Sequence, residues 1–143
     1  MTAEVSLLSW ASLIRGKPFI WGETDCVMLT LLALDKFLGT KNASTYAGRW
    51  TSREDALSYF DKETPSQWFT EHKGSRVDPA YAVIGDTITL PADPWPEQCH
   101  FILGHFSLAA DEARGVILIP TRFLLRQPGA TVWRLAQCLK QSQ

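Results

Sequence analysis

The chain has 143 residues, a mass of 16.0 kDa and a formal net charge of −1. This length predicts a single domain over residues 1–143, large enough to bury a core without a disulfide or metal to hold it. Hydrophobic residues make up 45% and charged residues 20%, which excludes an intrinsically disordered chain. Fourteen Lys and Arg against 15 Asp and Glu leave no basic excess, so we expect no nucleic-acid binding.

The sequence contains no candidate membrane span. The longest strongly apolar stretch, Val27–Leu34, is far shorter than the roughly 20 residues that a spanning helix needs. The N-terminal segment carries Glu4 where a signal peptide has basic residues. We therefore expect the protein to be cytoplasmic where it is synthesised.

The first half of the chain begins with two stretches of helical patterning. We predict a first helix over Val5–Arg15, ended by Gly16. A second helix begins after Thr24 or Asp25, either of which can cap it, and runs to about Leu38. Apolar residues occupy nearly all sides of this second helix, which predicts that it is buried.

Two shorter helical segments and a loop complete this half. Tyr46–Trp50 is predicted to be a loop. Ser52, with Asp55 three residues later, resembles a capping box and begins a helix that ends near Lys62. Ser66–His72 is predicted to be a further short helical turn.

From Val77 onward the pattern changes to that of strands. Ala92–Gln98 holds two prolines and is predicted to be a loop, and Asp111–Gly115 is predicted to be a hairpin loop. Thr131–Leu135 is either a last strand or part of a terminal helix. The predicted strands are Val83–Leu90, Phe101–Ala110 and Val116–Ile119. Helices followed by strands predict an α+β fold with segregated layers.

Cys26 opens the predicted second helix. A helix N-terminus carries a partial positive charge and free N–H groups, and both stabilise a thiolate over a thiol. A cysteine at this place can therefore serve as a nucleophile. The alternative is that Cys26 is only a small buried residue, because free cysteine is among the most buried residue types.

Three histidines are candidate bases for this cysteine. His72 lies in a polar stretch and is expected at the surface. His100 and His105 lie in the predicted strand region. Because they are five residues apart, they would face opposite sides of a regular strand, so only one can face Cys26.

We predict that His105 is the base and keep His100 as the alternative. The residue two positions along a strand shares the face of the histidine. Ser107 follows His105 at that position and would let the helix approach closely, whereas the bulkier Ile102 follows His100.

The segment Pro18–Gly22 (PFIWG), followed by Asp25 and Cys26, resembles the nucleophile segment of the NlpC-type papain-like cysteine peptidases. Gly85–Leu90 (GDTITL) is similar to the Gly-Asp strand of that family, and His105–Leu108 (HFSL) is similar to its histidine strand. The three motifs occur in the family's order, and the resemblance covers most of the chain.

The resemblance extends to the phage-encoded, tail-associated branch of this superfamily. Tyr46–Trp50 (YAGRW), Gly115–Pro120 (GVILIP) and the pair Trp133 and Arg134 look like stretches of that branch. The resemblance implies a papain-like fold in which a buried nucleophile helix packs on an antiparallel sheet from the C-terminal half.

The resemblance also implies a function. It suggests a phage or prophage tail-associated cysteine peptidase or amidase that acts on peptidoglycan stem peptides or another peptide or amide substrate. Cys26 would attack a carbonyl, His105 would transfer the proton, and Phe19, Trp21 and Asp25 would line the substrate site. Helix capping explains Asp25 equally well. No cofactor is implied, and phage tail proteins would be partners, with the virion tail as a second location.

The sequence departs from the family pattern at several places. Phe19 stands where the family has a tyrosine whose hydroxyl helps line the oxyanion site, and Val27 and Met28 replace Ser-Gly. The third group that would orient the histidine is not evident, and Asp111 and Thr121 are the candidates. The alternative function is therefore a catalytically inactive tail-assembly or tail-tip protein of the same fold.

A zinc site is a further alternative for the cysteines and histidines. Cys99, His100 and His105 are close in sequence, and Cys26 or Cys138 could supply a fourth ligand. The spacing does not resemble the paired ligands of structural zinc sites, so we predict no metal. Cys99 and Cys138 are expected to be small buried residues.

Overall fold

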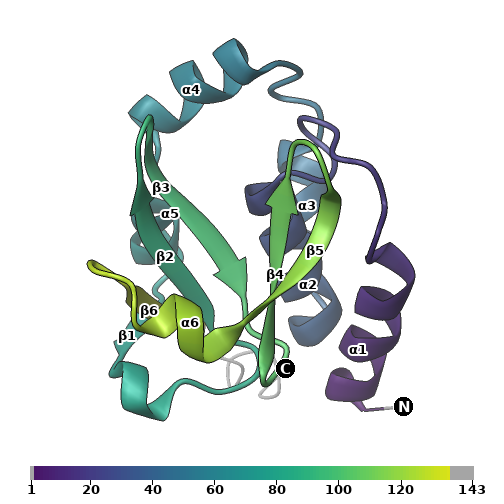
Figure 1. Cartoon of the computed structure of the whole chain (residues 1–143), viewed down its shortest axis with the longest axis vertical. Helices are drawn as coiled ribbons and strands as arrows, with labels where there is room; N and C mark the ends of the chain where they lie inside the picture. The colour runs from purple at the N-terminus through teal and green to yellow at the C-terminus, as the bar shows by residue number, and fades with distance from the viewer. Residues whose placement is uncertain (1, 136–143) are drawn as a thin grey trace.

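The structure, a computed structural model, describes residues 2–135 and combines helices with antiparallel β-sheets (Figure 1). The helices are α1 (Ala3–Ile14), α2 (Cys26–Leu38), α3 (Asn42–Tyr46), α4 (Arg53–Lys62), α5 (Pro65–Glu71), the 3-10 turn η1 (Pro79–Tyr81) and α6 (Thr121–Leu125). The strands are β1 (Ser75–Val77), β2 (Thr87–Ala92), β3 (Trp95–Phe101), β4 (Phe106–Asp111), β5 (Gly115–Pro120) and β6 (Thr131–Arg134). The α+β prediction is confirmed.

Helix α2 has the cap, the end and the burial that the sequence predicts. Asp25 is its N-cap, and the carboxylate accepts a hydrogen bond of 3.0 Å from the amide of Met28. Gly39 ends the helix in the left-handed conformation, with φ of 71°. Leu31 is buried and Leu32 is half-buried, as expected for a helix packed on several sides.

Three of the other helices, α1, α4 and α5, were predicted from the sequence, and two short ones were not. Helix α1 confirms the first predicted helix, and α4 begins after Ser52, whose hydroxyl accepts from the amide of Asp55. Helix α5 confirms the short helical turn, with a capping box formed by Thr64 and Gln67. Helices α3 and α6 were not predicted, because five residues are too few to show a helical period.

The larger sheet has the strand order β1-β6-β2-β3, all antiparallel. Strand β6 lies between β1 and β2, which decides the alternative at Thr131–Leu135 in favour of a strand. The predicted strand Val83–Leu90 begins only at Thr87, because the preceding residues form a turn.

The prediction that Ala92–Gln98 is a loop is wrong. Ala92 pairs with Trp95 across a tight turn, and β3 continues to Phe101. Pro96 is tolerated because β3 is the outermost strand of this sheet, where one side of the backbone needs no partner strand.

The prediction of one continuous strand over Phe101–Ala110 is also wrong. Strand β3 ends at Phe101, and the chain reverses through a turn before β4, with Leu103 donating to the carbonyl of Phe106. Gly104 permits this turn through its φ of 132°. Strands β4 and β5 form a separate antiparallel pair, with the Asp111–Gly115 hairpin as predicted.

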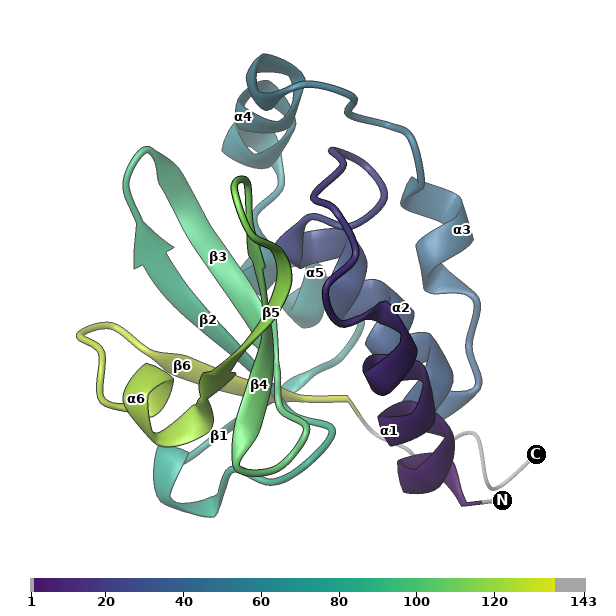
Figure 2. The ribbon, with the colours of Figure 1, turned by 45° about the vertical axis from the view of Figure 1, so that its right-hand side comes forward.

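Helices and strands form two layers around one main core. Figure 2 shows α1, α2 and α3 on one side and both sheets on the other. Helix α2 contacts both β3 and β4, so it lies at the centre of the molecule. A smaller apolar cluster between the larger sheet and α6 includes Ile88, Leu124 and Val132.

The Gly-Asp motif proves to be structural. A side chain at Gly85 would place its Cβ 2.3 Å from the Phe37 ring of α2, so only glycine fits there. Asp86 is buried, and its two carboxylate oxygens each accept a hydrogen bond of 2.8 Å from Arg134 of β6. The motif therefore connects α2, β2 and β6.

Candidate functional site

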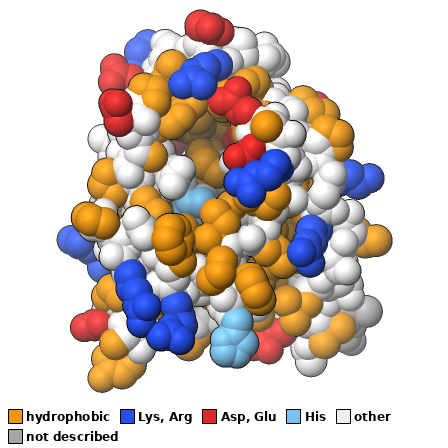
Figure 3. All heavy atoms as spheres, viewed as in Figure 1, with side chains coloured by type: hydrophobic (Ala, Val, Ile, Leu, Met, Phe, Trp, Pro, Cys, Tyr) orange, Lys and Arg blue, Asp and Glu red, His pale blue; other side chains and the backbone are white. Residues whose placement is uncertain are grey.

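The start of α2 opens into a cavity with about 960 Å³ of unfilled space, including the part that is open to solvent. Its walls come from the segment before α2, from α4, and from the β2–β3 and β4–β5 hairpins. Figure 3 shows a hollow in the face of the molecule between these two hairpins. The cavity brings together Cys26 and His100, two residues far apart in the sequence.

Cys26 is the first residue of α2 and is half-buried at the cavity wall. A residue at this position has no partner for its amide within the helix. The thiol of Cys99, on β3, lies next to it, with its Sγ 3.5 Å from the carbonyl oxygen of Cys26. The interaction with the Cys26 side chain and burial raise the pKa of the Cys99 thiol well above its ordinary value.

His100 lies on β3 and is 4% exposed. Its Nδ1 lies 2.9 Å from the carbonyl oxygen of Leu108, on β4. Because a carbonyl oxygen can only accept, Nδ1 carries the proton and Nε2 has the free lone pair. Nε2 is buried, and no hydrogen-bond partner for it is present among residues 2–135. Burial lowers the pKa of His100, which favours the neutral imidazole.

His105 occupies a different place. It lies in the turn between β3 and β4, it is exposed, and it does not line the cavity that contains Cys26. Ser107, whose small size favoured His105, is buried and bonds Thr121 at 2.8 Å. His100 and His105 do not share one regular strand, because the turn at Gly104 separates β3 from β4, and strand periodicity therefore does not relate the two side chains. The alternative base, His100, is the histidine that shares a cavity with Cys26.

Asp25 lies at the cavity wall, but its carboxylate is engaged within the chain. One oxygen accepts from the amide of Gly22 and from Nε1 of Trp50, both at 2.7 Å, and the other accepts from Met28. Burial raises the pKa of Asp25, and these hydrogen bonds oppose that shift. The carboxylate thus fixes the loop before α2, the start of α2 and Trp50.

Phe19 and Trp21, which the resemblance assigns to a substrate site, line the cavity that contains Cys26. Their rings meet edge to face with centroids 4.6 Å apart, and Trp21 also lies 5.5 Å from the ring of Trp95. These three aromatic side chains give the cavity an apolar wall beside Cys26.

Among the described residues, neither candidate for a third catalytic residue forms a hydrogen bond with His100. Asp111 lines the cavity, but its carboxylate accepts from the amides of Ala113 and Arg114. Thr121 donates to the carbonyl of Gly104. The group that orients the imidazole is the backbone carbonyl of Leu108, which no side-chain motif could reveal.

Several residues of the cavity wall were not predicted from the sequence. Trp95, Glu97 and Gln98 lie there because the supposed loop is the strand β3. Glu112 and Phe60 also line it. No periodic pattern in the sequence marked this strand, and the two prolines that flank Trp95 indicated a loop.

Within residues 2–135, no group of three or more His, Cys, Asp and Glu side chains could hold a metal ion. Cys138, considered as a zinc ligand or a buried residue, lies outside the described residues. None of the helices between residues 2 and 135 has the length and apolar character needed to cross a membrane.

The model of a family described as a domain of unknown function, DUF6950, matches residues 2–135. The chain belongs to this family. The match includes every residue of the cavity around Cys26 and His100. A search of the curated proteins gives no match.

Proposed function

We propose that this DUF6950 chain is a cysteine hydrolase of peptide or amide bonds, with Cys26 as the nucleophile and His100 as the base. The observation that carries the proposal is the Nε2 atom of His100. It is buried, it has no partner among residues 2–135, and its ring lines the same cavity as Cys26. A buried polar atom without a partner is costly, and such atoms in native proteins call for an explanation.

The neutral tautomer of His100 that has its proton on Nδ1 is suited to act as a base. The Leu108 carbonyl holds the proton on Nδ1, so Nε2 carries the free lone pair that a base needs. The lowered pKa of His100 means that the resting imidazole is neutral near neutral pH. It can then accept the thiol proton during attack.

In the first half of the reaction, Sγ of Cys26 forms a bond to the substrate carbonyl carbon and Nε2 of His100 takes the thiol proton. The C–N bond then breaks, the imidazolium returns that proton to the leaving amine, and a thioester remains on Cys26. In the second half, His100 takes a proton from water as its oxygen attacks the thioester. The C–S bond breaks, and the proton restores the thiol as the acid leaves.

The developing oxyanion needs hydrogen-bond donors. The amide of Cys26 is one, because it opens α2 and has no partner within the helix. The side-chain amide of Gln98, which lines the same cavity, is a second donor within the chain.

The resemblance to the NlpC-type peptidases supports a finer proposal. It suggests a papain-like arrangement of α2 against the strands, peptidoglycan stem peptides as the substrate class, and a role in a phage or prophage tail. The aromatic wall formed by Phe19, Trp21 and Trp95 fits a peptide substrate.

The test uses the full chain and four variants: Cys26→Ala, His100→Asn, Cys26→Ala with His100→Asn, and His105→Ala. Purified peptidoglycan is incubated with each, and released peptides are measured by mass spectrometry. The rate of Cys26 alkylation by iodoacetamide is measured from pH 5 to 9 in parallel, in every variant that keeps the thiol. His105→Ala is the matched control, since His105 lies outside the cavity.

We expect no release by either variant that lacks Cys26, a loss of about 10²-fold or more for His100→Asn, and no change for His105→Ala. If His105→Ala alone alters the alkylation profile, the base is His105. If neither histidine variant alters it and no peptide is released, the hydrolase proposal fails and the tail-assembly function is favoured. If His100→Asn alters the alkylation of Cys26 but the unmodified chain releases no peptide, the pairing of Cys26 with His100 is supported and peptidoglycan is rejected as the substrate.

A further inference from the structure

Cys99 is a second thiol beside the proposed nucleophile, and the proposed hydrolase mechanism makes no use of it. It lies on β3, directly before His100, and is 2% exposed. Helix α2 packs against β3, and the Sγ atom of Cys99 lies 3.5 Å from the carbonyl oxygen of Cys26. Both cysteines are free thiols in the structure. Two oxidisable sulfur atoms from distant parts of the sequence therefore lie together at the start of α2.

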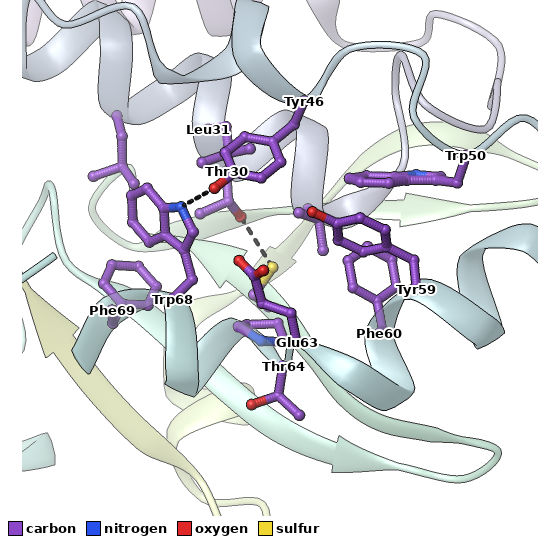
Figure 4. Close-up of a pocket in the computed structure, with 14 residues that line it drawn as sticks. Thr30, Leu31, Tyr46, Trp50, Tyr59, Phe60, Glu63, Thr64, Trp68 and Phe69 are labelled. Carbon is purple, nitrogen blue, oxygen red and sulfur yellow. Dashed lines mark hydrogen bonds between the residues drawn. The ribbon is translucent and has the colours of Figure 1, made fainter. Parts of the chain in front are cut away.

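Thr30 holds the Cys99 thiol in this position. Its hydroxyl, one turn after Cys26 in α2, lies 2.9 Å from the carbonyl oxygen of Cys26 and 3.4 Å from Sγ of Cys99. Figure 4 shows the second of these contacts as a dashed line between the Thr30 hydroxyl and the sulfur atom. The Cys99 thiol is thus bonded to the first turn of α2 and does not turn away from Cys26.

The two thiols differ in their access to solvent. Cys26 is half-buried at the wall of a cavity that is open to solvent, so an oxidant as small as hydrogen peroxide can reach it. Cys99 is buried and does not line that cavity. An oxidant from solvent therefore reacts first at Cys26. Cysteines that sense oxidants commonly have this arrangement, in which an accessible thiol lies beside a second, resolving thiol.

We propose that hydrogen peroxide converts Cys26 and Cys99 into a reversible disulfide, with Cys99 as the resolving cysteine. In the first step, Sγ of Cys26 attacks one peroxide oxygen and the O–O bond breaks. The departing hydroxide takes the proton that the Cys26 thiol lost, and Cys26 becomes a sulfenic acid. In the second step, Sγ of Cys99 attacks Sγ of Cys26, the S–O bond breaks, and the hydroxyl group leaves as water with the thiol proton of Cys99. Two thiols are oxidised by two electrons in total, and one peroxide is reduced to two waters.

Oxidation of Cys26 also makes Cys99 a better nucleophile. In the reduced protein, the interaction with the Cys26 side chain and burial raise the pKa of the Cys99 thiol, and the hydrogen bond from Thr30 opposes that rise. A protonated sulfenic acid carries no negative charge, so the repulsion between two thiolates no longer opposes ionisation of Cys99. The Thr30 hydroxyl remains in place to stabilise the attacking sulfur. The two steps therefore occur in a fixed order.

The disulfide has two consequences for Cys26. It protects the sulfur from further oxidation to the sulfinic and sulfonic acids, which are not reversed by thiols. It also occupies the nucleophile and so stops hydrolysis until a thiol reductant restores it. This second consequence rests on the proposed hydrolase function, whereas formation of the disulfide does not.

The experiment treats the reduced full chain with hydrogen peroxide, blocks the remaining thiols with iodoacetamide, and maps the peptides by mass spectrometry without reduction. We expect a crosslinked peptide pair that joins Cys26 to Cys99, and we expect dithiothreitol to restore the alkylation of Cys26. Cys138→Ser is the matched control, because it removes the third cysteine of the chain. This variant should form the same crosslink to the same extent.

Cys99→Ser tests the resolving role with a side chain of similar size, and a thermal melt establishes that it is folded. Without the resolving thiol, the sulfenic acid at Cys26 should persist and react with dimedone. We expect at least about tenfold more dimedone adduct than in the unmodified chain, and incomplete recovery of the Cys26 thiol by dithiothreitol. The crosslink itself is measured in the unmodified chain, so the proposal does not depend on the folding of this variant.

The proposal is overturned if peroxide produces no crosslink between Cys26 and Cys99, or if Cys26 pairs only with Cys138 or with a second copy of the chain. It is also overturned if Cys99→Ser forms no more dimedone adduct than the unmodified chain and recovers its thiol as fully. These measurements use no substrate, so failure of the hydrolase proposal leaves them unaffected. Loss of peptide release on oxidation, with recovery in dithiothreitol, tests the regulation of hydrolysis separately.

Discussion

The two cavities beside α2 share Val27 and Phe60 but differ in how they are built. The cavity around Cys26 is formed by segments distant in the sequence, and three acidic side chains besides Asp25 line it: Glu97, Asp111 and Glu112. The second cavity, which we call the aromatic cavity (Figure 4), is formed mainly by α2 and the helices that follow it. Glu63 is the acidic side chain among its lining residues, and the aromatic ones are Tyr46, Trp50, Tyr59, Phe60, Trp68 and Phe69.

We infer from this difference that the cavity around Cys26 serves the reaction and that the aromatic cavity serves core packing. Two acidic side chains of the cavity around Cys26 form salt bridges. A guanidinium nitrogen of Arg53 lies 3.1 Å from a carboxylate oxygen of Glu112, and one of Arg114 lies 3.3 Å from a carboxylate oxygen of Asp111. Among residues 2–135, Nε2 of His100 has no hydrogen-bond partner, and we expect the proposed chemistry there. In the aromatic cavity, side chains contribute mainly to the core and therefore to stability. Three predictions test this division.

The largest expected effect concerns Leu31, which lines the aromatic cavity and is 4% exposed. Leu31→Ala removes buried apolar surface and enlarges the cavity, so we expect it to lower the free energy of unfolding by about 2–5 kcal/mol. Leu32→Ala, on a half-buried neighbour, should cost less. Chemical denaturation measures both. Equal losses would show that the aromatic cavity contributes nothing particular to stability.

The second prediction compares the two cysteines. Cys99 lines the aromatic cavity, is 2% exposed, and has a raised pKa, so its thiol stays protonated near neutral pH. Cys26 lines the other cavity and is half-buried. We expect iodoacetamide to alkylate Cys26 at least about tenfold faster in the folded protein.

Peptide mapping by mass spectrometry assigns each alkylated cysteine, and it also distinguishes Cys138. Unfolding in denaturant is the control, because it should remove the difference between Cys26 and Cys99. Comparable rates in the folded protein would contradict the assignment of reactivity to one cavity.

The smallest expected effect is the pH dependence that His100 contributes to stability. Its pKa in the folded protein lies below the usual 6.5 because of burial. As the pH falls below about 6.5, the unfolded chain therefore binds a proton that the folded chain does not, and stability is lost. We expect His100 to account for a loss of at most about 1 kcal/mol between pH 7 and pH 5.5, the limit reached if the folded imidazole stays neutral over this range.

His100→Asn isolates this contribution, since asparagine can still donate to the Leu108 carbonyl. Asp25 has a raised pKa, so its contribution has the opposite sign, being greatest at low pH and lost as the pH rises through its folded value. Asp25 is present in both proteins and cancels in the difference. Parallel pH profiles of unfolding free energy for the two proteins would refute the role assigned to burial of His100.

The helical part of the fold was predictable because its signals are local. A cap at Thr24 or Asp25, the end at Gly39 and the apolar surface of α2 are all predictable from a few residues, and the structure confirms the end and the burial and gives Asp25 as the cap. The α+β class followed from the change of pattern near Val77. The five-residue helices α3 and α6 carried no periodic signal.

The candidate site likewise has one part that was predictable from the sequence and one part that was not. The sequence by itself placed Cys26 at a helix start and Phe19 and Trp21 near it, because all of these lie within one short segment. Only the tertiary structure decided which histidine joins them, because that depends on the turn at Gly104 and on the pairing of β3 with β2. The carbonyl of Leu108 and the walls of both cavities were likewise decided by packing, since contacts between distant segments leave no local pattern.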